Sequence, residues 1–334
     1  MIAGRRAIGP PPPIPYTESA SGPMSRFQPL FRNPHFQTIA GHYWKRPAPD
    51  HRYPVERRLY QTEPGVQVLV ESQRPLETTR GEVIMLHGLE GSAKAVYIAS
   101  LSGVLLDAGF AAHRFNMRTC GGTEHLSDTL YHGGLTSDLL AVVRQLKSEG
   151  RGPIYLIGFS LGGNVVVKLA GELGDSGPDH IRAVCAVSAP LDLGRCARRV
   201  MERDNMVYDW RFVRRMRQRL LATGKYKAET LSRLTSVMAI DDHITAPAFG
   251  FGDAQNYYRT QSAIGYLPGL RVPVLLIYSK DDTLVPNQTF DAPEVAGNPW
   301  IRRIATEHGG HLGFIGKQPH RFWLDTTIRD WLVG

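Results

Sequence analysis

One serine of the chain stands in a context suited to nucleophilic catalysis. The sequence Gly158-Phe-Ser160-Leu-Gly162 follows a short apolar run and precedes a stretch with helical spacing. A turn between a strand and a helix projects a serine hydroxyl clear of the sheet, and the two glycines allow neighbouring backbone to approach. The pattern predicts that Ser160 is a nucleophile. The alternative interpretation is an ordinary serine in a glycine-rich turn.

A serine nucleophile needs a base, and two histidines near the C-terminus are candidates. His308 and His311 are separated by Gly309 and Gly310. We favour His311 as the base, because the glycines directly before it allow a tight loop to bring its imidazole to the serine. His308 is then structural or lines the site. A metal site is not expected, because the spacing lacks a glutamate and a third ligand.

Two adjacent aspartates could orient that base. Asp281 and Asp282 stand just after the apolar run 274–278, which we predict to be a strand, with two residues between. A carboxylate on the loop after this strand could reach a histidine over the edge of the sheet. Either aspartate is a candidate on this ground, and the other would cap a turn or hold the loop.

Two backbone amides are candidates for binding the negatively charged oxygen that forms when a serine attacks a carbonyl carbon. The Leu161 amide opens the predicted helix after the serine. The Leu89 amide follows His87-Gly88, where the glycine would let the amide point inward and His87 would support the turn. The alternative is a plain strand-to-helix loop. A phosphate-binding loop is excluded, since residues 88–94 do not match G-x-x-x-x-G-K-[ST].

The chain around these residues alternates between strands and helices, which predicts a mostly parallel sheet with helices on both faces. A hairpin is predicted at residues 55–62 and 66–72. Apolar runs predict strands at residues 83–87, 111–115, 154–157, 183–187, 274–278 and 300–305. Helical spacing predicts helices at residues 95–109, 135–149, 161–173 and 318–332. The candidate side chains follow strands and are therefore expected at one edge of the sheet.

The alternation breaks at about residues 191–270, which we interpret as a cap over that edge and not as an independent domain. Its first part, residues 191–227, is expected to be helical and is rich in arginine. The arginines are Arg195, Arg198, Arg199, Arg203, Arg211, Arg214, Arg215, Arg217 and Arg219. They form either a solvated face or a surface that attracts an anionic membrane or an acidic substrate. Nucleic-acid binding is not expected, because no recognition motif accompanies the charge.

Together these motifs resemble the α/β-hydrolase superfamily, and within it the AB hydrolase 4 family of YheT-like esterases. The resemblance covers the chain from about residue 30 to its end. It rests on eight segments in order, at residues 33–38, 87–92, 116–122, 131–138, 158–164, 245–251, 257–258 and 308–314. It implies an α/β-hydrolase fold, built on a mostly parallel eight-stranded sheet with helices on both faces and a helical cap insertion.

The resemblance also implies a serine hydrolase that cleaves carboxylic esters of short- to medium-chain or lipid-like acyl groups, without a cofactor. Its triad would be Ser160, Asp282 and His311, because Asp282 has the spacing usual for the acid in related hydrolases. The chain departs from the family pattern at Phe36 and at Thr119, where glycine is usual. An acyltransferase with the same triad is an alternative, and a non-catalytic binding protein on the same scaffold is another. Residues 33–38 are interpreted as a strap on the cap or at the pocket rim.

The composition limits the class of protein to which the chain can belong. The chain has 334 residues, a formal net charge of +8 and only three cysteines, which excludes a disulfide framework and predicts free thiols. Cys120 follows a strand, but Ser160 has the better setting for a nucleophile. Residues 1–25 are rich in proline, glycine and serine and are predicted to be a flexible arm before a single domain at residues 26–334. Without an apolar signal segment or membrane span, a cytoplasmic protein that acts on a small-molecule ester is expected.

Overall fold

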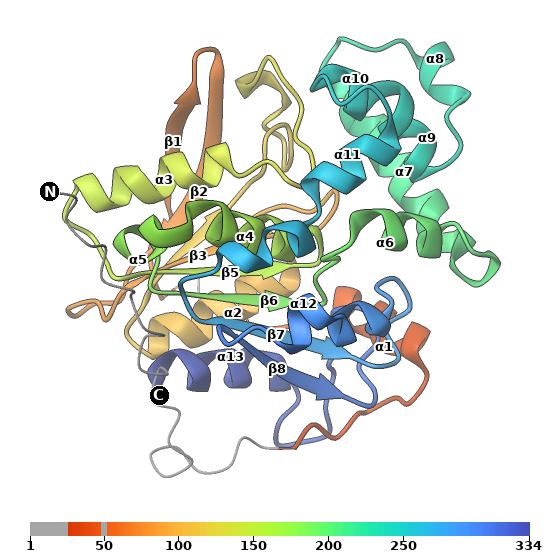
Figure 1. Ribbon diagram of the computed structural model, residues 1–334. Coiled ribbons are helices and arrows are strands. Elements are labelled where there is room, and N and C mark those ends of the chain that lie inside the picture. The colour runs from red at the N-terminus through yellow and green to blue at the C-terminus, as the bar shows by residue number, and fades with distance from the viewer. Residues whose placement is uncertain (1–25, 48–51) are drawn as a thin grey trace, which may run out of the picture.

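The computed structural model describes residues 26–47 and 52–334, so the arm predicted at residues 1–25 lies outside the described residues. Eight strands form one sheet with helices on both faces (Figure 1). The order across the sheet is β1-β2-β4-β3-β5-β6-β7-β8. The strands are β1 (Glu56–Glu63), β2 (Val66–Gln73), β3 (Glu82–Leu86), β4 (Ala111–Phe115), β5 (Ile154–Phe159), β6 (Ala183–Val187), β7 (Val274–Ser279) and β8 (Ile301–Thr306). The predicted mostly parallel eight-stranded sheet is confirmed.

The strand β2 runs antiparallel to both of its neighbours, whereas the pairs from β4 across to β8 are parallel. Parallel neighbours need a crossover between them, and each crossover here carries helical segments or the cap. The carboxyl ends of these parallel strands therefore share one edge, and the loops after β3, β5, β7 and β8 carry the residues singled out above.

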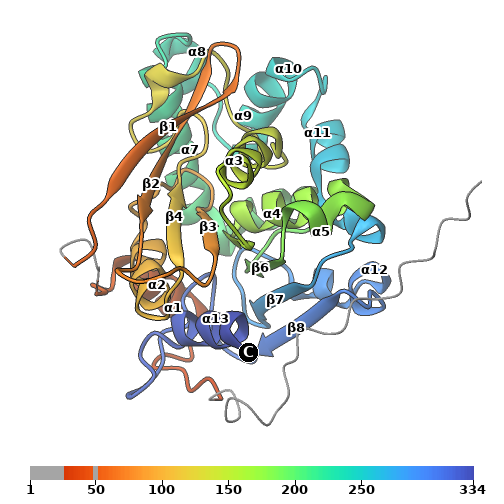
Figure 2. The ribbon, with the colours of Figure 1, turned by 90° about the vertical axis from the view of Figure 1, so that its left-hand side faces the viewer.

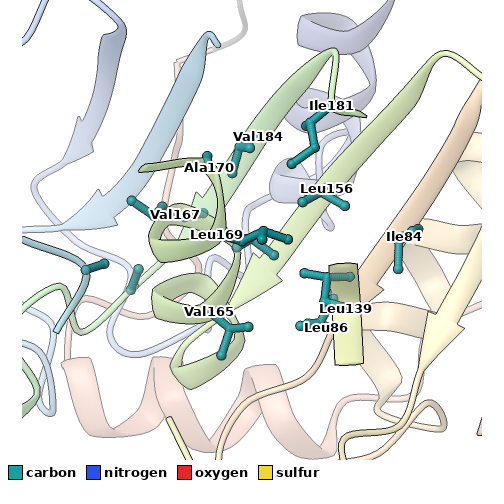
Figure 3. Close-up of a cluster of buried hydrophobic side chains, with 14 of the residues drawn as sticks. Ile84, Leu86, Leu139, Leu156, Val165, Val167, Leu169, Ala170, Ile181 and Val184 are labelled. Atoms are coloured by element: carbon teal, nitrogen blue, oxygen red, sulfur yellow. The ribbon is translucent and has the colours of Figure 1, made fainter. Parts of the chain in front are cut away.

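Helices cover both faces of the sheet because its central strands are apolar on both sides. On one face, Val83 and Met85 belong to a cluster with side chains of α2 (Val96–Asp107) and α13 (Trp323–Val333). On the other face, Ile84 and Leu86 cluster with side chains of α3 (Ser137–Ser148) and α4 (Leu161–Leu173) (Figure 3). Figure 2 shows the two helical layers on either side of the strands.

Between β6 and β7 the chain leaves the sheet and forms the cap segment, which we define as residues 191–270. Its helices are α6 (Leu193–Val200), η3 (Arg203–Asn205), α7 (Met206–Ala222), α8 (Ala228–Ser232), α9 (Val237–Ile240), the π-helix η4 (Asp241–Thr245), α10 (Ala246–Ala248), α11 (Ala254–Gln261) and η5 (Ala263–Gly269). Val213 and Met216 of α7 pack in a small core with Ile240, and Leu130 from outside the cap belongs to the same core. The cap segment thus shares its packing with the rest of the molecule.

Shorter elements complete the structure. They are α1 (Pro34–Tyr43), η1 (Glu124–Leu126), η2 (Gly174–Ser176), α5 (Gly177–His180), η6 (Asn287–Asp291) and α12 (Pro293–Ala296). Residues 33–38, interpreted above as a strap, are the start of helix α1. Asn33 caps this helix by accepting hydrogen bonds from the His35 and Phe36 amides, and Pro34 occupies its first turn.

The helix predicted at residues 318–332 begins later than expected, at Trp323. The preceding segment instead folds back, so that Ile315 and Phe322 form an isolated β-bridge. Hydrogen bonding in this turn outweighs the local helical spacing of the sequence, which is a common outcome at element boundaries.

Candidate active site

Ser160 lies at the junction of β5 and α4 with φ 50° and ψ −122°. This region is unfavourable for a residue with a side chain, so the surrounding structure has to hold it. A Cβ atom at Gly158 would overlap the backbone of Gly162 and Gly163, and one at Gly162 would overlap the His87 carbonyl oxygen. The close approach expected from the two glycines is therefore present, and the turn presents the Ser160 hydroxyl above the sheet edge.

The structure brings Ser160 together with one of the two candidate histidines. The Ser160 Oγ lies 2.9 Å from Nε2 of His311. On the other side of the ring, Nδ1 of His311 lies 3.0 Å and 3.1 Å from the carboxylate oxygens of Asp282. A carboxylate at Nδ1 favours the tautomer with the proton on Nδ1, which leaves Nε2 free to accept the serine proton.

Backbone amides and helix α1 hold the two partners of the serine in place. The amides of Leu284 and Val285 donate to Oδ1 of Asp282 at 2.9 and 3.0 Å, which fixes the orientation of the carboxylate. The amide of His311 donates to the Thr38 hydroxyl oxygen at 2.9 Å, and that hydroxyl donates to the Pro34 carbonyl oxygen. Thr38 lies in the segment interpreted as a strap, so this helix touches the site.

The other aspartate and histidine form a second pair beside the first. Nδ1 of His308 lies 3.1 Å from Oδ2 of Asp281. Oδ1 of Asp281 accepts from the Ser279 hydroxyl and from the Gly310 amide, each at 2.9 Å. These contacts tie the loop after β7 to the loop after β8, so the pair holds the loops that carry Asp282 and His311.

The loop after β3 brings Leu89 to the serine. A Cβ atom at Gly88 would come within 3.0 Å of the Ser160 Cβ, which measures how closely this loop approaches. The amides on either side of Leu89 donate to tyrosine hydroxyls, Gly88 to Tyr97 at 3.3 Å and Glu90 to Tyr131 at 3.1 Å. These contacts orient the Leu89 peptide.

His87 supports the same turn in a defined protonation state. Its Nε2 accepts from the Met117 amide at 3.2 Å, so its Nδ1 carries the proton and donates to the Gly88 carbonyl oxygen at 2.8 Å. Complete burial lowers the pKa of His87 to about 4, and the ring stays neutral at physiological pH. The predicted supporting position of His87 matches this geometry.

Two hollows meet at Ser160 and His311. The inner pocket, about 780 Å³ including space open to solvent, runs beneath the cap segment, and its apolar wall includes Leu193, Val200 and Met216. The outer groove, about 2020 Å³ on the same measure, runs between α1, the loop after β3 and helix α7. The serine hydroxyl is thus reached from two sides, one mostly apolar and one wider and more polar.

Sequence similarity shows the family to which the chain belongs. A sequence profile of the alpha/beta hydrolase fold matches residues 82–318. The chain belongs to the α/β-hydrolase family. It is 32% identical over 314 residues to the "Putative esterase YheT" of Escherichia coli, with 91% of each chain covered. This bears out the resemblance to YheT-like proteins.

One further relative in sequence and one solved structure also resemble this α/β-hydrolase. A "Monoacylglycerol lipase" of Saccharomyces cerevisiae is 28% identical over 255 residues, which cover 72% of this chain and 56% of that one. The structure of the Pyrococcus furiosus esterase Pf2001 matches with a TM-score of 0.59, covering 86% of this chain and 97% of that chain at 20% identity. At that identity the structural likeness shows the fold alone.

This α/β-hydrolase has a buried ion pair beside its site that sequence reasoning missed. Arg219 of α7 donates through Nε to Glu90 at 2.8 Å and through Nη1 to the Thr119 hydroxyl at 3.0 Å. Both Glu90 and Thr119 have positive φ, 55° and 58°. The departure from glycine at Thr119 therefore supplies a polar partner for the cap segment. The charge at position 90 was visible in the sequence, but its partner lies 129 residues away.

A second missed residue is Asp241, which lines the inner pocket from the π-helix. The Tyr258 hydroxyl donates to its Oδ2 at 2.7 Å. Burial raises the pKa of Asp241 to about 6, because the charged form loses hydration there. A short π-helix within α-helical structure is common at functional sites, but nothing in the local sequence predicts it.

Three further findings concern the described residues of this α/β-hydrolase. Burial raises the pKa of the Cys120 thiol far above its usual range, so it stays protonated and unreactive. Across residues 26–47 and 52–334, no cluster of three or more histidine, cysteine, aspartate or glutamate side chains could hold a metal ion. None of the helices in those ranges has the length and apolar character needed to span a membrane.

Proposed function

We propose that this protein is a serine hydrolase of carboxylic esters and that Ser160, His311 and Asp282 are its catalytic residues. The observation that carries the proposal is the continuous chain of contacts from the Ser160 Oγ through both ring nitrogens of His311 to Asp282. Relatives named as an esterase and as a lipase support the same reaction class.

In the first half of the reaction, His311 accepts the Ser160 proton at Nε2 while the hydroxyl oxygen attacks the ester carbonyl carbon. Asp282 holds the imidazole by its Nδ1–H and stabilises the imidazolium that forms. His311 then donates the proton to the leaving alcohol, and an acyl group remains on Ser160. In the second half, His311 takes a proton from water, whose oxygen attacks the acyl carbon. The bond to the Ser160 oxygen then breaks, the imidazolium returns the proton to that oxygen, and the acid is released.

The tetrahedral intermediates carry a negative oxygen, for which we propose the Leu89 and Leu161 amides as donors. Leu161 is the first residue of α4, so its amide belongs to the positive end of the helix dipole. The peptide of Leu89 is oriented by the tyrosine contacts of its neighbours. Donors that are already oriented need no rearrangement as the charge develops, which is why they lower the barrier.

The two hollows supply a place for each half of an ester. The inner pocket is mostly apolar and accommodates an acyl chain, which gains free energy as its apolar surface leaves water. The outer groove accommodates the alcohol part. Since that groove is wide, an alcohol other than water could also reach the acyl group, and transfer to such an acceptor is the competing outcome.

Hydrolysis of a chain-length series of p-nitrophenyl esters tests the proposal. We expect activity to increase from acetate until the acyl chain fills the inner pocket, and Ser160→Ala to lower turnover by about 10³-fold or more. A serine-reactive phosphonate should label the native protein and not Ser160→Ala. Full activity in Ser160→Ala would overturn the proposal. An added alcohol that yields new ester faster than free acid would assign a transferase.

A further inference from the structure

Helix α1 exposes an apolar stripe to solvent. Phe36, Ile39 and Tyr43 are 61%, 48% and 64% exposed. Their spacing of three and four residues places them on one face of the helix. A surface helix of a globular protein ordinarily turns such a stripe toward the core. An apolar stripe that faces solvent therefore indicates a surface that another molecule covers.

The first turns of helix α7 expose a second apolar set. Met206, Val207 and Trp210 are 61%, 74% and 61% exposed. The same helix buries Val213 and Met216 in the core of the cap segment. Helix α7 is thus apolar toward the cap over its later turns and apolar toward solvent at its start.

The two exposed sets form one surface, because α1 and α7 contact each other. The rings of His35 and Tyr208 stack with centroids 5.8 Å apart, and Nδ1 of His35 lies 3.1 Å from the Tyr208 hydroxyl. Arg211 donates to the Tyr43 hydroxyl at 2.5 Å. We call the six exposed apolar side chains and the helix faces that carry them the α1/α7 face.

Exposed basic side chains lie close in sequence to the side chains of the α1/α7 face. The exposed ones nearest in sequence are Arg32, Lys45, Arg203, Arg214 and Arg215. Arg214 also lies over the Trp210 ring, 5.7 Å from its centroid. The exposed carboxylates of Glu202 and Asp204 both form salt bridges with Arg199. The face therefore combines large apolar side chains with net positive charge.

Part of the α1/α7 face borders the groove that leads to Ser160. Ile39, Tyr43 and Val207 line the outer groove, whose lining continues to Ser160 and His311. A patch of large exposed apolar side chains on a soluble domain marks an interaction site. Aromatic and apolar side chains interspersed with arginine and lysine suit the boundary between lipid headgroups and acyl chains.

We propose that the α1/α7 face docks on an anionic lipid bilayer. The apolar side chains enter the boundary between headgroups and acyl chains, and the arginines and Lys45 pair with lipid phosphates. Each basic side chain near a negative membrane surface contributes attraction that salt screens. Docking places the mouth of the outer groove on the membrane. This goes beyond ester hydrolysis, and the surface binds lipid whether or not Ser160 is active.

Vesicle co-sedimentation of the Ser160→Ala protein tests docking without catalysis. We expect binding to phosphatidylcholine vesicles that contain phosphatidylglycerol, weaker binding to phosphatidylcholine alone, and release by salt. The triple variant Phe36→Ser, Met206→Ser, Trp210→Ser should lower binding by about 10-fold or more, since each lost apolar side chain removes insertion free energy. None of these three side chains lines the inner pocket or the outer groove.

A matched control removes exposed apolar side chains elsewhere. The triple variant Leu59→Ser, Leu76→Ser, Val333→Ser changes residues that are 45%, 86% and 42% exposed and lie outside the α1/α7 face. It should bind vesicles as the parent does. The variant Arg203→Glu, Arg214→Glu should lose the preference for anionic vesicles. Circular dichroism and thermal unfolding check that each variant is folded.

Two results would overturn the docking proposal. One is no binding of the parent protein to either vesicle, and the other is equal loss in the two triple variants. If the parent instead forms a dimer that the first triple variant dissociates, and binds no vesicles, the face is an interface between copies. In the active protein, hydrolysis of soluble p-nitrophenyl acetate should be unchanged by the first triple variant, so failure of docking and failure of the proposed hydrolase are read separately.

Discussion

Two aspartate–histidine pairs lie side by side at the edge of the sheet, and only one of them reaches the serine. Asp282 and His311 have side chains that are 1% and 9% exposed, whereas those of Asp281 and His308 are 20% and 37% exposed. The residue types and the carboxylate–imidazole distances of the two pairs are nearly the same. The difference teaches that position beside Ser160, and not the presence of an aspartate–histidine pair, decides which pair contacts the serine hydroxyl.

The glycines between the two histidines separate the pairs. Gly310 has φ 56°, and a Cβ atom there would approach the Thr38 hydroxyl within 2.7 Å. The turn at Gly310 sends His308 back toward Asp281 and His311 forward to Ser160. Asp281 accepts from the Gly310 amide, so the outer pair secures the turn that delivers the inner histidine.

Replacing each histidine with alanine should give the largest difference in kcat between the two pairs. We expect His311→Ala to lower kcat for p-nitrophenyl esters by about 10⁴- to 10⁶-fold, because the serine then lacks its base. His308→Ala should lower kcat by less than about 10-fold, since it removes a contact between loops and no proton acceptor. Steady-state kinetics of both variants provide the measurement. The reverse ranking would move the base to His308.

Replacing each aspartate with asparagine should give a smaller difference in kcat between the two pairs. One variant should lose mainly activity and the other mainly stability. Asp282→Asn should lower kcat by about 10³- to 10⁴-fold, because an amide no longer favours the Nδ1–H tautomer. Asp281→Asn should leave kcat within about 10-fold and lower the free energy of unfolding by about 1–3 kcal/mol, since it disturbs the contacts to His308, Ser279 and Gly310.

Urea unfolding and steady-state kinetics on the same two preparations check this contrast. A large loss of kcat in Asp281→Asn with native stability would contradict the purely supporting role of the outer pair. Near-native kcat in Asp282→Asn would remove Asp282 from the catalytic residues, whatever its stability.

Asp241 extends the comparison to a buried carboxyl group whose partner is a phenol. Its pKa of about 6 in the folded protein lies above the value of about 3.9 for an unfolded aspartate. Between these values the folded state binds a proton that the unfolded state has released, so this group lowers the free energy of unfolding as pH rises through that range. Above about pH 6 the full destabilisation is present.

Asp241→Asn removes the charge and keeps the shape. We expect its free energy of unfolding relative to the native protein to be about 1–3 kcal/mol higher near pH 7.5 than near pH 4.5. Urea unfolding of both proteins at the two pH values measures this double difference. A difference that does not vary with pH would show that the carboxyl titrates as in the unfolded chain.

Much of the fold could be predicted from local pattern. The strands at residues 111–115 and 183–187 have the predicted bounds, because short apolar runs between turn residues leave little choice for a chain that must bury them. The start of helix α1 carried a readable signal in Asn33 and Pro34, but the polar character of residues 33–38 outweighed it in the prediction. The small helices after α7 have neither strong periodicity nor length, and so their pattern did not reveal them.

The sequence by itself determined the sharp turn at Ser160, since only glycines at positions 158 and 162 permit the backbone contacts around it. Only the tertiary structure decided which aspartate meets which histidine, that Arg219 meets Glu90, and that two apolar helix faces join beside the groove. Local conformation depends on neighbouring residues, which the sequence displays directly. Contacts between residues a hundred or more positions apart depend on how whole elements pack, and no local pattern encodes that packing.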